Sequence, residues 1–432
     1  MNVRHSVPAL LCLVLTLSCS GTPARVAAPT GKISSTPAAT SGSASPTAGP
    51  HREPAVTLAY FRPGLGVVGV SPDCCGNQGT GGARLWLTTD MHRWLDVTPP
   101  NSGRGRLPGE HPIFEDASFV DASTGWVSTW DVGDLSVVVY RTRDAGRHWS
   151  RRRAGGHGAH AGATARFQLL SPSTAYRQEL DPAGPVVHLS ITRDSGGHWT
   201  TVYDGWTRQK RGHPFGPFER PVTFVSAEHG FAADVVSLPD FPYETTGQLF
   251  ETSDGGRTWS TMRPPLAGGS PCERGRAPTC VLGLPTFFDG SNGVLPGAGR
   301  RGARTTISFD RTTDAGATWS IASSLTLPDE GAGTSRCAVT CTLTSIAAPS
   351  DWWLLSRVSG GYATWRTTDA GIRWTHHAAT LPAADRAVSL WALTPSLAWA
   401  VTEVRVPSGT TTQLMRSVDG GTTWRRVVPA AG

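Results

Sequence analysis

One eight-residue pattern recurs along the chain and constrains the fold more than any other feature of the sequence. It reads Ser or Thr, any residue, Asp, any residue, Gly, any two residues and Trp, as in TRDAGRHW at 142–149 and SVDGGTTW at 417–424. Six full copies place their aspartates at intervals of 50, 60, 60, 55 and 50 residues: Asp144, Asp194, Asp254, Asp314, Asp369 and Asp419. A repeat of nearly constant period is typical of a stacked or radial array of structural units.

A degenerate seventh copy precedes these six. TTDMHRW at 88–94 keeps Thr88, Asp90 and Trp94, but it lacks the Gly and is one residue short. Asp90 lies 54 residues before Asp144, which matches the spacing of the other copies. We therefore expect seven units.

Each unit carries a second recurring element upstream of the octapeptide. FVDASTGWVS from residue 119 and FVSAEHGFAAD from residue 224 are examples, with a short polar turn between two apolar runs. This pattern predicts a β-hairpin. A third run leads into each octapeptide and a fourth follows its Trp. Each unit is therefore predicted to be a four-stranded antiparallel meander, with the octapeptide as the turn between strands three and four.

The residue types of the octapeptide suit a tight turn. The Asp carboxylate can accept hydrogen bonds from backbone N–H groups of its own loop, and the Ser or Thr hydroxyl can add another. Gly allows a positive φ, and the Trp ring can fold onto the sheet or the next unit. We predict a structural role for these residues: Asp90, Trp94, Asp144, Gly146, Trp149, Asp194, Gly196, Trp199, Asp254, Gly256, Trp259, Asp314, Gly316, Trp319, Asp369, Gly371, Trp374, Asp419, Gly421 and Trp424.

The octapeptide resembles the Asp-box, also called the bacterial neuraminidase repeat. Seven copies, each inside a four-stranded unit, imply an all-β fold: a seven-bladed β-propeller over residues 55–430. The paired signature of a Phe…Gly-Trp hairpin and the octapeptide is most similar to the photosystem II assembly-factor type of propeller and its bacterial relatives, whereas sortilin-like and sialidase propellers are more distant. Six or eight blades remain open alternatives. The ring could also need a strand from near residue 55 to complete its last blade.

The N-terminal residues predict export. Arg4 precedes an apolar stretch, VPALLCLVLTL, that is too short to span a bilayer, and TLSC then resembles a bacterial lipobox. We predict a lipoprotein signal peptide at 1–19, lipidation of Cys19 and a location on the outer side of the bacterial cell membrane; ordinary signal cleavage nearby is the alternative. Residues 20–54 are rich in Ser, Thr, Ala and Pro, which predicts a disordered tether.

The cysteines agree with export. Six remain after the signal peptide and the lipidated Cys, and an even number in an exported protein suggests disulfides. The local candidate pairs are Cys272 with Cys280 and Cys337 with Cys341, while Cys74 and Cys75 pair with each other, pair elsewhere or stay reduced. A zinc site is the alternative, although the spacings fit no common zinc finger. We expect no metal and no cofactor.

The long, irregular segments should all lie on the face opposite the octapeptides. These segments are 71–82, 152–165, 204–221, 234–246, 265–284 and 325–344. Loops that vary on a rigid scaffold often carry binding residues. Candidate ligand-contacting residues on that face are Trp206, Arg208, Arg211 and Tyr362. Acidic residues fall near the same loops: Asp131, Asp134, Glu179, Asp181, Asp240 and Glu244.

We expect a non-catalytic binding or assembly module whose partner is a protein or a cell-envelope glycan. The formal net charge is +6, but the arginines are spread along the chain, which argues against nucleic-acid binding. The alternative is a glycoside hydrolase of the sialidase-like type. For that reading YFRPG at 60–64 distantly echoes a sialidase motif with Arg62 as the sugar-binding residue, and Tyr362 is the candidate nucleophile.

Overall fold

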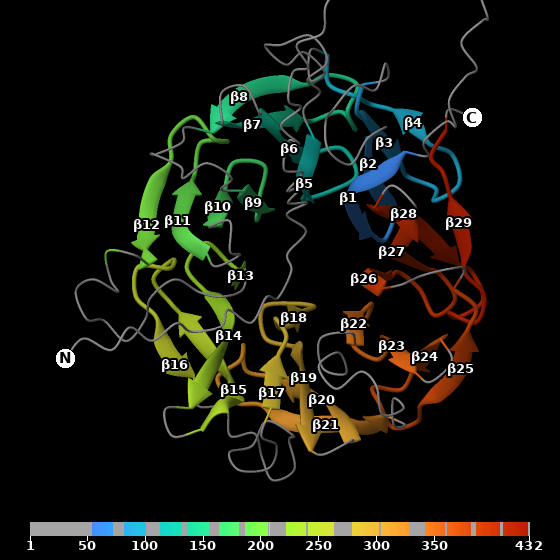
Figure 1. Ribbon diagram of the computed structural model, residues 1–432. Helices are drawn as coiled ribbons and strands as arrows, with labels where there is room; N and C mark the ends of the chain where they lie inside the picture. The colour runs from blue at the N-terminus through green and yellow to red at the C-terminus, as the bar shows by residue number, and fades with distance from the viewer. Residues whose placement is uncertain are drawn as a thin grey trace, which may run out of the picture.

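The computed structural model forms a ring of seven antiparallel blades (Figure 1). It describes residues 54–71, 82–100, 113–131, 136–154, 164–180, 186–205, 207, 222–238, 241–262, 279–301, 304–327, 342–358, 361–381, 386–406 and 409–430. The predicted all-β seven-bladed propeller is confirmed, and the alternatives of six or eight blades are not. The signal peptide and tether predicted for 1–54 lie outside the described residues apart from Pro54.

The strands follow one another outward in each blade, so the first strand is innermost and the fourth is outermost (Figure 1). Blades 1 to 3 comprise β1 (Ala55–Arg62), β2 (Leu65–Ser71), β3 (Arg84–Thr88), β4 (Leu95–Asp96); β5 (Ile113–Phe119), β6 (Gly125–Asp131), β7 (Ser136–Thr142), β8 (Ser150–Ala154); and β9 (Thr164–Leu169), β10 (Ala175–Leu180), β11 (Val186–Thr192), β12 (Thr200–Asp204).

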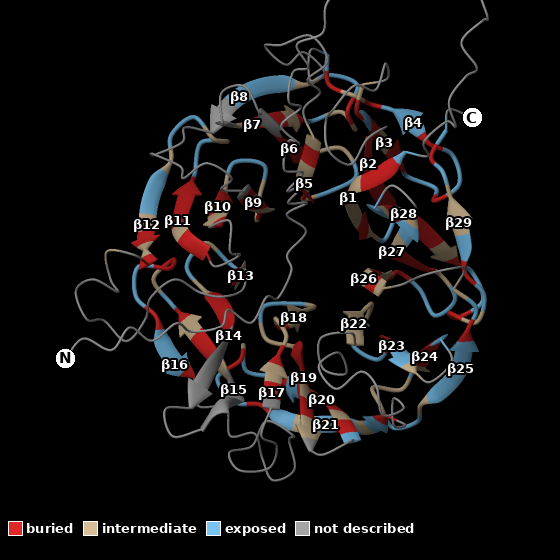
Figure 2. Cartoon of the chain, viewed as in Figure 1, coloured by how far each residue is buried: buried red, intermediate tan, exposed pale blue. Residues whose placement is uncertain are grey.

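Blades 4 to 7 repeat this order, with one break in the inner strand of blade 5. They comprise β13 (Val222–Phe224), β14 (Gly230–Leu238), β15 (Phe241–Thr252), β16 (Ser260–Met262); β17 (Thr279–Leu282), β18 (Thr286–Phe287), β19 (Gly293–Arg301), β20 (Arg304–Thr312), β21 (Ser320–Leu327); β22 (Thr342–Ile346), β23 (Trp352–Val358), β24 (Gly361–Thr367), β25 (Thr375–Ala379); and β26 (Arg386–Ala392), β27 (Ala398–Val406), β28 (Gly409–Ser417), β29 (Arg425–Val427). The middle strands are mostly buried and the outer strands mostly exposed (Figure 2).

In blades 2 to 7 the two predicted turns of a blade lie side by side. In blade 2 the Ala145 N–H donates to the Ser123 carbonyl at 2.9 Å, and in blade 7 the Gly420 N–H donates to the Ser396 carbonyl at 3.0 Å. We call this end of the ring the turn face; in blade 2 it comprises residues 120–124 and 143–149. The other end, where strands two and three are joined and where the blades are joined, is the connector face.

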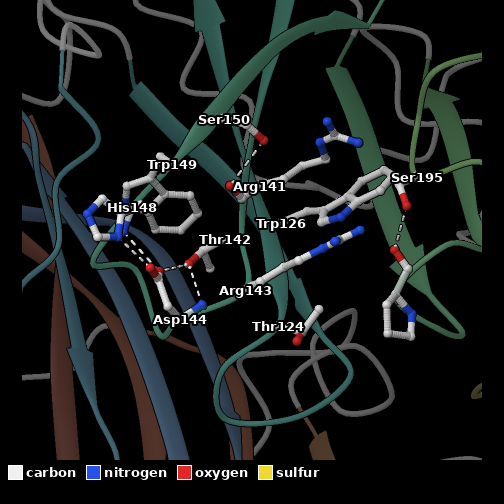
Figure 3. Close-up of a pocket in the computed structure, with 11 residues that line it drawn as sticks. Thr124, Trp126, Arg141, Thr142, Arg143, Asp144, His148, Trp149, Ser150 and Ser195 are labelled. Atoms are coloured by element: carbon white, nitrogen blue, oxygen red, sulfur yellow. Dashed lines mark hydrogen bonds and ion pairs between the residues drawn. The ribbon is translucent and has the colours of Figure 1, made fainter.

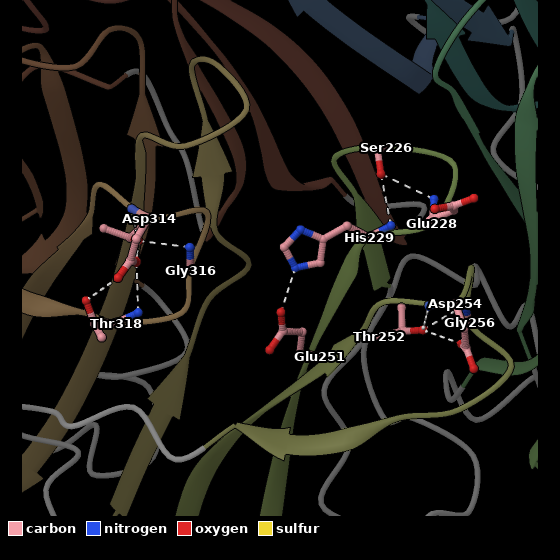
Figure 4. Close-up of polar contacts among 11 residues, drawn as sticks. Ser226, Glu228, His229, Glu251, Thr252, Asp254, Gly256, Asp314, Gly316 and Thr318 are labelled. Carbon is pink, nitrogen blue, oxygen red and sulfur yellow. Dashed lines mark hydrogen bonds and ion pairs between the residues drawn. The ribbon is translucent and has the colours of Figure 1, made fainter.

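The octapeptide turn is held by its Asp and its Thr, as the turn of blade 5 shows (Figure 4). Asp314 Oδ1 accepts from the Thr312 hydroxyl and from the Thr318 N–H, both at 2.8 Å, while Oδ2 accepts from the Thr318 hydroxyl at 2.6 Å. The Thr312 hydroxyl in turn accepts from the Gly316 N–H at 2.9 Å. The structural role predicted for these residues matches this geometry.

The turn needs a positive φ at two successive residues, not only at the Gly. In blade 5 Ala315 has φ of 60° and Gly316 of 93°. A side chain in this left-handed region costs about 1–2 kcal/mol, so the turn carries strain at its first position in the blades that place Ala or Ser there. Gly255 and Gly420 occupy that position in blades 4 and 7.

Each interface between blades contains one octapeptide Trp in its hydrophobic cluster. Trp149, for example, reaches back to blade 1, where its Nε1 donates to the Val97 carbonyl at 2.8 Å. The seven interfaces, from blades 7 and 1 round to blades 6 and 7, contain Trp94, Trp149, Trp199, Trp259, Trp319, Trp374 and Trp424 respectively. The Trp therefore joins its own blade to the one before it.

Polar side chains of one blade also satisfy the open inner edge of the next. Gln178 of blade 3 donates to the Val222 carbonyl at 2.7 Å and accepts from the Val222 N–H at 2.9 Å. Ser118 of blade 2 accepts from the Leu169 N–H at 2.9 Å. The inner strand of a blade has no neighbouring strand on its channel side, so these bonds occupy backbone groups that would otherwise be unpaired.

Among the described strands the ring closes through side chains, without strand exchange. The strand from residue 55, β1, pairs with β2 in blade 1, while blade 7 is built entirely from β26 to β29. Phe61, Trp94 and Trp399 share the cluster between blades 7 and 1, and the Thr412 hydroxyl donates to the Val56 carbonyl at 2.5 Å.

One local prediction was wrong. Segment 234–246 was expected to be an irregular loop, but β14 and β15 extend through most of it as a paired hairpin, with Asp234 opposite Gln248 and Ser237 opposite Thr245. Antiparallel pairing can continue past the blade because the two strands satisfy each other. On β23, Trp352 and Trp353 are both fully buried, on opposite faces of the strand and in different interfaces.

Candidate functional site

Most of the residues proposed from the sequence as binding or modified residues lie outside the described part of the chain. They are Cys19, Cys74, Cys75, Trp206, Arg208, Arg211, Cys272, Cys337 and Cys341. The same holds for most of the long segments predicted for the connector face, and for Asp134, Asp181 and Asp240. The role of these loops and the cysteine pairing stay predictions.

Cys280 is the one predicted disulfide residue in the described ranges. It lies on β17, not in a loop, and is 1% exposed in the interface of blades 4 and 5. It does not carry a free thiol. Pairing with Cys272 stays a prediction because that residue is outside the described ranges.

Tyr362 is a packing residue at the connector-face end of β24. Its side chain is 5% exposed, and its hydroxyl accepts from the Ala387 N–H of blade 7 at 2.8 Å. This is the same capping of a neighbouring inner strand that Gln178 performs. Its predicted exposure to a ligand is therefore wrong, because the hydroxyl points into the interface between blades.

The two residues of the sialidase-like interpretation lie at opposite ends of the blades. Arg62 ends β1 at the turn face, where its Nη1 donates to the Phe119 carbonyl at 2.8 Å. Tyr362 is the second residue of β24, at the connector-face end of that strand. The structure does not bring this Arg and this Tyr into one site.

One charged ladder crosses blade 3 near the connector face. Glu179, His188 and Asp204 stand opposite one another on β10, β11 and β12. His188 Nδ1 lies 3.4 Å from Glu179 Oε2, and its Nε2 lies 3.6 Å from Asp204 Oδ1; Arg177 pairs with Glu179 at 2.7 Å. The hydrogen bond with Glu179 raises the pKa of His188. Glu179, one of the acidic residues that the sequence places near the connector-face loops, thus belongs to a polar cluster.

Two adjacent carboxyl groups are held out of water on β5, the inner strand of blade 2. Burial raises the pKa of Glu115 to about 8 and that of Asp116 to about 6. Asp116 accepts from the Phe167 N–H of blade 3 at 2.6 Å, whereas Glu115 Oε2 has no hydrogen-bond partner among the described residues. Neither residue stood out in the sequence, since a bulge between Phe114 and Asp116 decides where they lie.

A pocket of about 450 Å³ opens on the turn face between blades 2 and 3 (Figure 3). Blade 2 contributes the start of β6, the end of β7 and its octapeptide, while blade 3 contributes two turn residues. The lining residues are Thr124, Trp126, Arg141, Thr142, Arg143, Asp144, His148, Trp149, Ser150, Pro172 and Ser195. The sequence predicts only a structural role for the octapeptides on this face.

The charge of this pocket is predominantly positive. The single carboxylate in its lining, Asp144, is occupied by the turn: it accepts from the His148 N–H at 2.9 Å and from Thr142, and its Oδ2 lies 2.6 Å from His148 Nδ1. Hydrogen bonds from the backbone N–H and the ring of His148 lower the pKa of Asp144 to about 2. Arg141 and Arg143 have no ion-pair partner within the described ranges.

No group of three or more His, Cys, Asp or Glu side chains in the described residues could hold a metal ion. In the same part of the chain, no helix is long and apolar enough to cross a bilayer.

Comparison with known proteins adds solved structures but no family. No protein-family model matches the chain, and no curated protein matches it. Among solved structures, YCF48 bound to D1 peptide is 16% identical with a TM-score of 0.42, covering 73% of this chain and 82% of that one. A polysaccharide lyase of family PL25, an ulvan lyase, is 10% identical with a TM-score of 0.42, covering 74% and 79%.

The propeller domain of the Trilobed protease from Pyrococcus furiosus is 6% identical with a TM-score of 0.44, covering 87% of this chain and 98% of that one. At these identities the similarity is not informative about ligand or activity. The number of blades follows from the strand pairings within this chain.

Proposed function

We propose that this chain is an exported, lipid-anchored propeller of the Asp-box type that acts as a non-catalytic binding or assembly module for an acidic protein or cell-envelope glycan. The observation that carries this proposal is the concentration of arginines on the turn face of blades 2 and 3. Arg143, Arg147 and Arg193 are exposed there, beside the pocket that contains Arg141.

The turn itself does not require these cations. Blade 5 forms the same turn with Thr313 and Ala317 where blade 2 has Arg143 and Arg147. Since the turn geometry is satisfied by uncharged residues, the arginines of blades 2 and 3 are available for another role. Clustered positive charge attracts acidic partners and speeds their association.

The positions of the two chain ends are compatible with a partner located away from the membrane surface. Both β1 and β29 have their free ends at the connector face, because β1 runs toward the first turn and β29 runs away from the last octapeptide. A tether from Cys19 would therefore join at the connector face, leaving the turn face directed outward on average. A flexible tether of this length has an end-to-end distance of roughly 30 Å.

The proposal is tested by retention of envelope components on the full chain purified in detergent. We expect retention of acidic components that weakens as salt is raised, since screening shortens the reach of surface charge. Hydrolysis of a fluorogenic sialoside or of aryl glycosides by the same preparation would overturn the non-catalytic part. No retention of any envelope component at low salt would overturn the binding role.

A further inference from the structure

Three blades place an Arg directly before the Ser or Thr of the octapeptide and over the ring of a Trp on the second strand. A half-buried guanidinium in this position normally needs a partner for its charge. The three pairs, with the distance from the guanidinium carbon to the ring centroid, are Arg141 over Trp126 at 5.9 Å, Arg366 over Trp353 at 5.9 Å and Arg416 over Trp399 at 5.4 Å.

In blade 6 the neighbouring blade provides that partner. Arg366 Nη1 donates to the Pro395 carbonyl in the first turn of blade 7. The space for this contact exists because Gly420 has no side chain: a Cβ there would lie 2.8 Å from Arg366 Nη1. Asp351 also lies close enough for Arg366 to lower its pKa, although burial dominates and raises it.

In blade 2 the same contact is blocked by one residue. Ser195 stands where blade 7 has Gly420, and its hydroxyl donates to the Pro172 carbonyl at 3.0 Å. Pro172 is the counterpart of Pro395, so the Ser195 side chain occupies the space beside this carbonyl through which an Arg reaches it in blade 6. Arg141 instead lines the open pocket (Figure 3). Its buried Nε has no hydrogen-bond partner among the described residues, and the same is true of Arg366 and Arg416, so the difference from Arg366 lies in the Nη1 contact with the neighbouring blade.

The surroundings of Arg141 are unfavourable to its charge. Burial lowers its pKa, and the like charges of Arg152 and Arg143 lower it further; only Asp194 acts in the opposite direction. Blade 4 shows a different solution, because Glu251 holds the equivalent position and pairs with His229 at 2.8 Å (Figure 4). In blades 4 and 6 the residue at this position has a partner within the protein. An anion bound in the pocket of blade 2 would provide such a partner for Arg141.

We propose that this pocket, the Arg141 pocket, binds the anionic group of one sugar residue in an acidic cell-envelope polysaccharide. The inference rests on the proposed function and names its ligand class. Arg141 and Arg143 provide guanidinium donors for a carboxylate, sulfate or phosphate group, and Thr124 and Ser150 provide hydroxyls for the sugar.

A small sugar fits this site better than a protein surface does. The pocket is concave and its volume lies in the range of small-molecule sites, whereas a stable protein interface buries about 800 Å² on each partner. A lipid headgroup is less suited, because a tether joined at the connector face directs the turn face away from the membrane.

The experiment measures affinities of the full chain in detergent for polygalacturonate, dextran sulfate, neutral dextran, poly-glutamate and phosphatidylglycerol vesicles. We expect binding to one or both acidic polysaccharides and none to neutral dextran. Arg141→Gln should weaken the binding about tenfold or more, since it removes charged hydrogen bonds. The matched control Arg366→Gln removes an equivalent Arg that already has a partner, and it should change the affinity less than about twofold.

Ser195→Gly tests the mechanism while keeping every cation. It should free the Pro172 carbonyl for Arg141, as Gly420 does for Arg366, and so weaken binding about as much as Arg141→Gln. Gly suits this position because Ser195 has φ of 61°. Equal thermal unfolding midpoints of the variants would show that the fold is intact.

Four outcomes would overturn the inference. Equal weakening of binding by Arg141→Gln and Arg366→Gln would show that the affinity depends on the overall surface charge and not on this pocket. Unchanged affinity of Ser195→Gly would show that Ser195 does not keep Arg141 from the Pro172 carbonyl. Tighter Arg141-dependent binding of poly-glutamate or of the vesicles would indicate a protein or a lipid ligand instead. Binding to envelope components that no Arg141 variant affects would leave the proposed function standing and refute the pocket.

Discussion

The ring of Phe61 stacks on the ring of Trp399, with centroids 4.6 Å apart and planes inclined by 10°. Phe61 belongs to the first blade and Trp399 to the last, so this contact joins the two ends of the propeller. Trp94 packs edge-on against Trp399 at 5.8 Å in the same cluster. No strand of one terminal blade crosses into the other among the described residues, so closure depends on these side chains.

Phe61→Ala should therefore loosen the closure itself. Removing a buried Phe costs about 3–5 kcal/mol of unfolding free energy, measured by urea titration. Hydrogen exchange should quicken first in blades 1 and 7. The matched control is Phe309→Ala, which removes a comparable stack on Trp352 at 5.0 Å between covalently linked blades. Unchanged protection in blades 1 and 7 would contradict closure by this cluster.

The two positive-φ positions of one octapeptide should respond to substitution in opposite directions. Gly371→Ala places a Cβ about 2.3 Å from the Ser323 Cβ at φ of 83°, so a loss of about 2–4 kcal/mol is expected. Ala370→Gly, at φ of 57°, relieves strain and should be neutral or stabilising by up to about 1 kcal/mol. Equilibrium unfolding of both variants decides, and a loss at both positions would refute the turn geometry.

Gln178→Leu should test the capping of inner strands. Gln178 is 3% exposed, and its amide occupies both backbone groups of Val222. Leu cannot replace either bond, so about 2–4 kcal/mol of stability should be lost in denaturant titrations. The exposed substitution Val418→Ala is the control and should stay within about 0.5 kcal/mol of the parent protein. A similarly small effect of Gln178→Leu would show that water satisfies Val222.

Stability should fall as pH rises from about 5 to about 8. The pKa of Glu115 is raised by burial to about 8 from an ordinary 4.5, so across this range the folded state retains a proton that the unfolded chain releases. Asp116, with a raised pKa of about 6, acts in the same direction. Glu115→Gln should raise the melting temperature at pH 7.5 and leave it nearly unchanged at pH 4, measured by calorimetry. An unchanged pH profile, equal to that of the exposed Glu228→Gln control, would contradict this assignment.

The sequence determined the architecture because the octapeptide is a local structure. Asp314, Thr312 and Gly316 form their turn from residues within five positions of one another, so their spacing alone predicts it. Counting such turns gives the number of blades. The spacing of the Trp residues likewise predicts where each blade meets its neighbour.

Tertiary structure decided the rest, because the deciding contacts join residues far apart in the chain. Tyr362 resembles an exposed loop residue until Ala387 of the next blade occupies its hydroxyl. Arg141 and Arg366 occupy the same position in their repeats. They differ because of one residue in the following blade. Gly420 leaves room for Arg366 to donate to the Pro395 carbonyl, whereas the Ser195 side chain lies beside the equivalent Pro172 carbonyl in front of Arg141. Repeats make the turns alike, whereas the interfaces between blades determine which charges are satisfied and which remain available to a ligand.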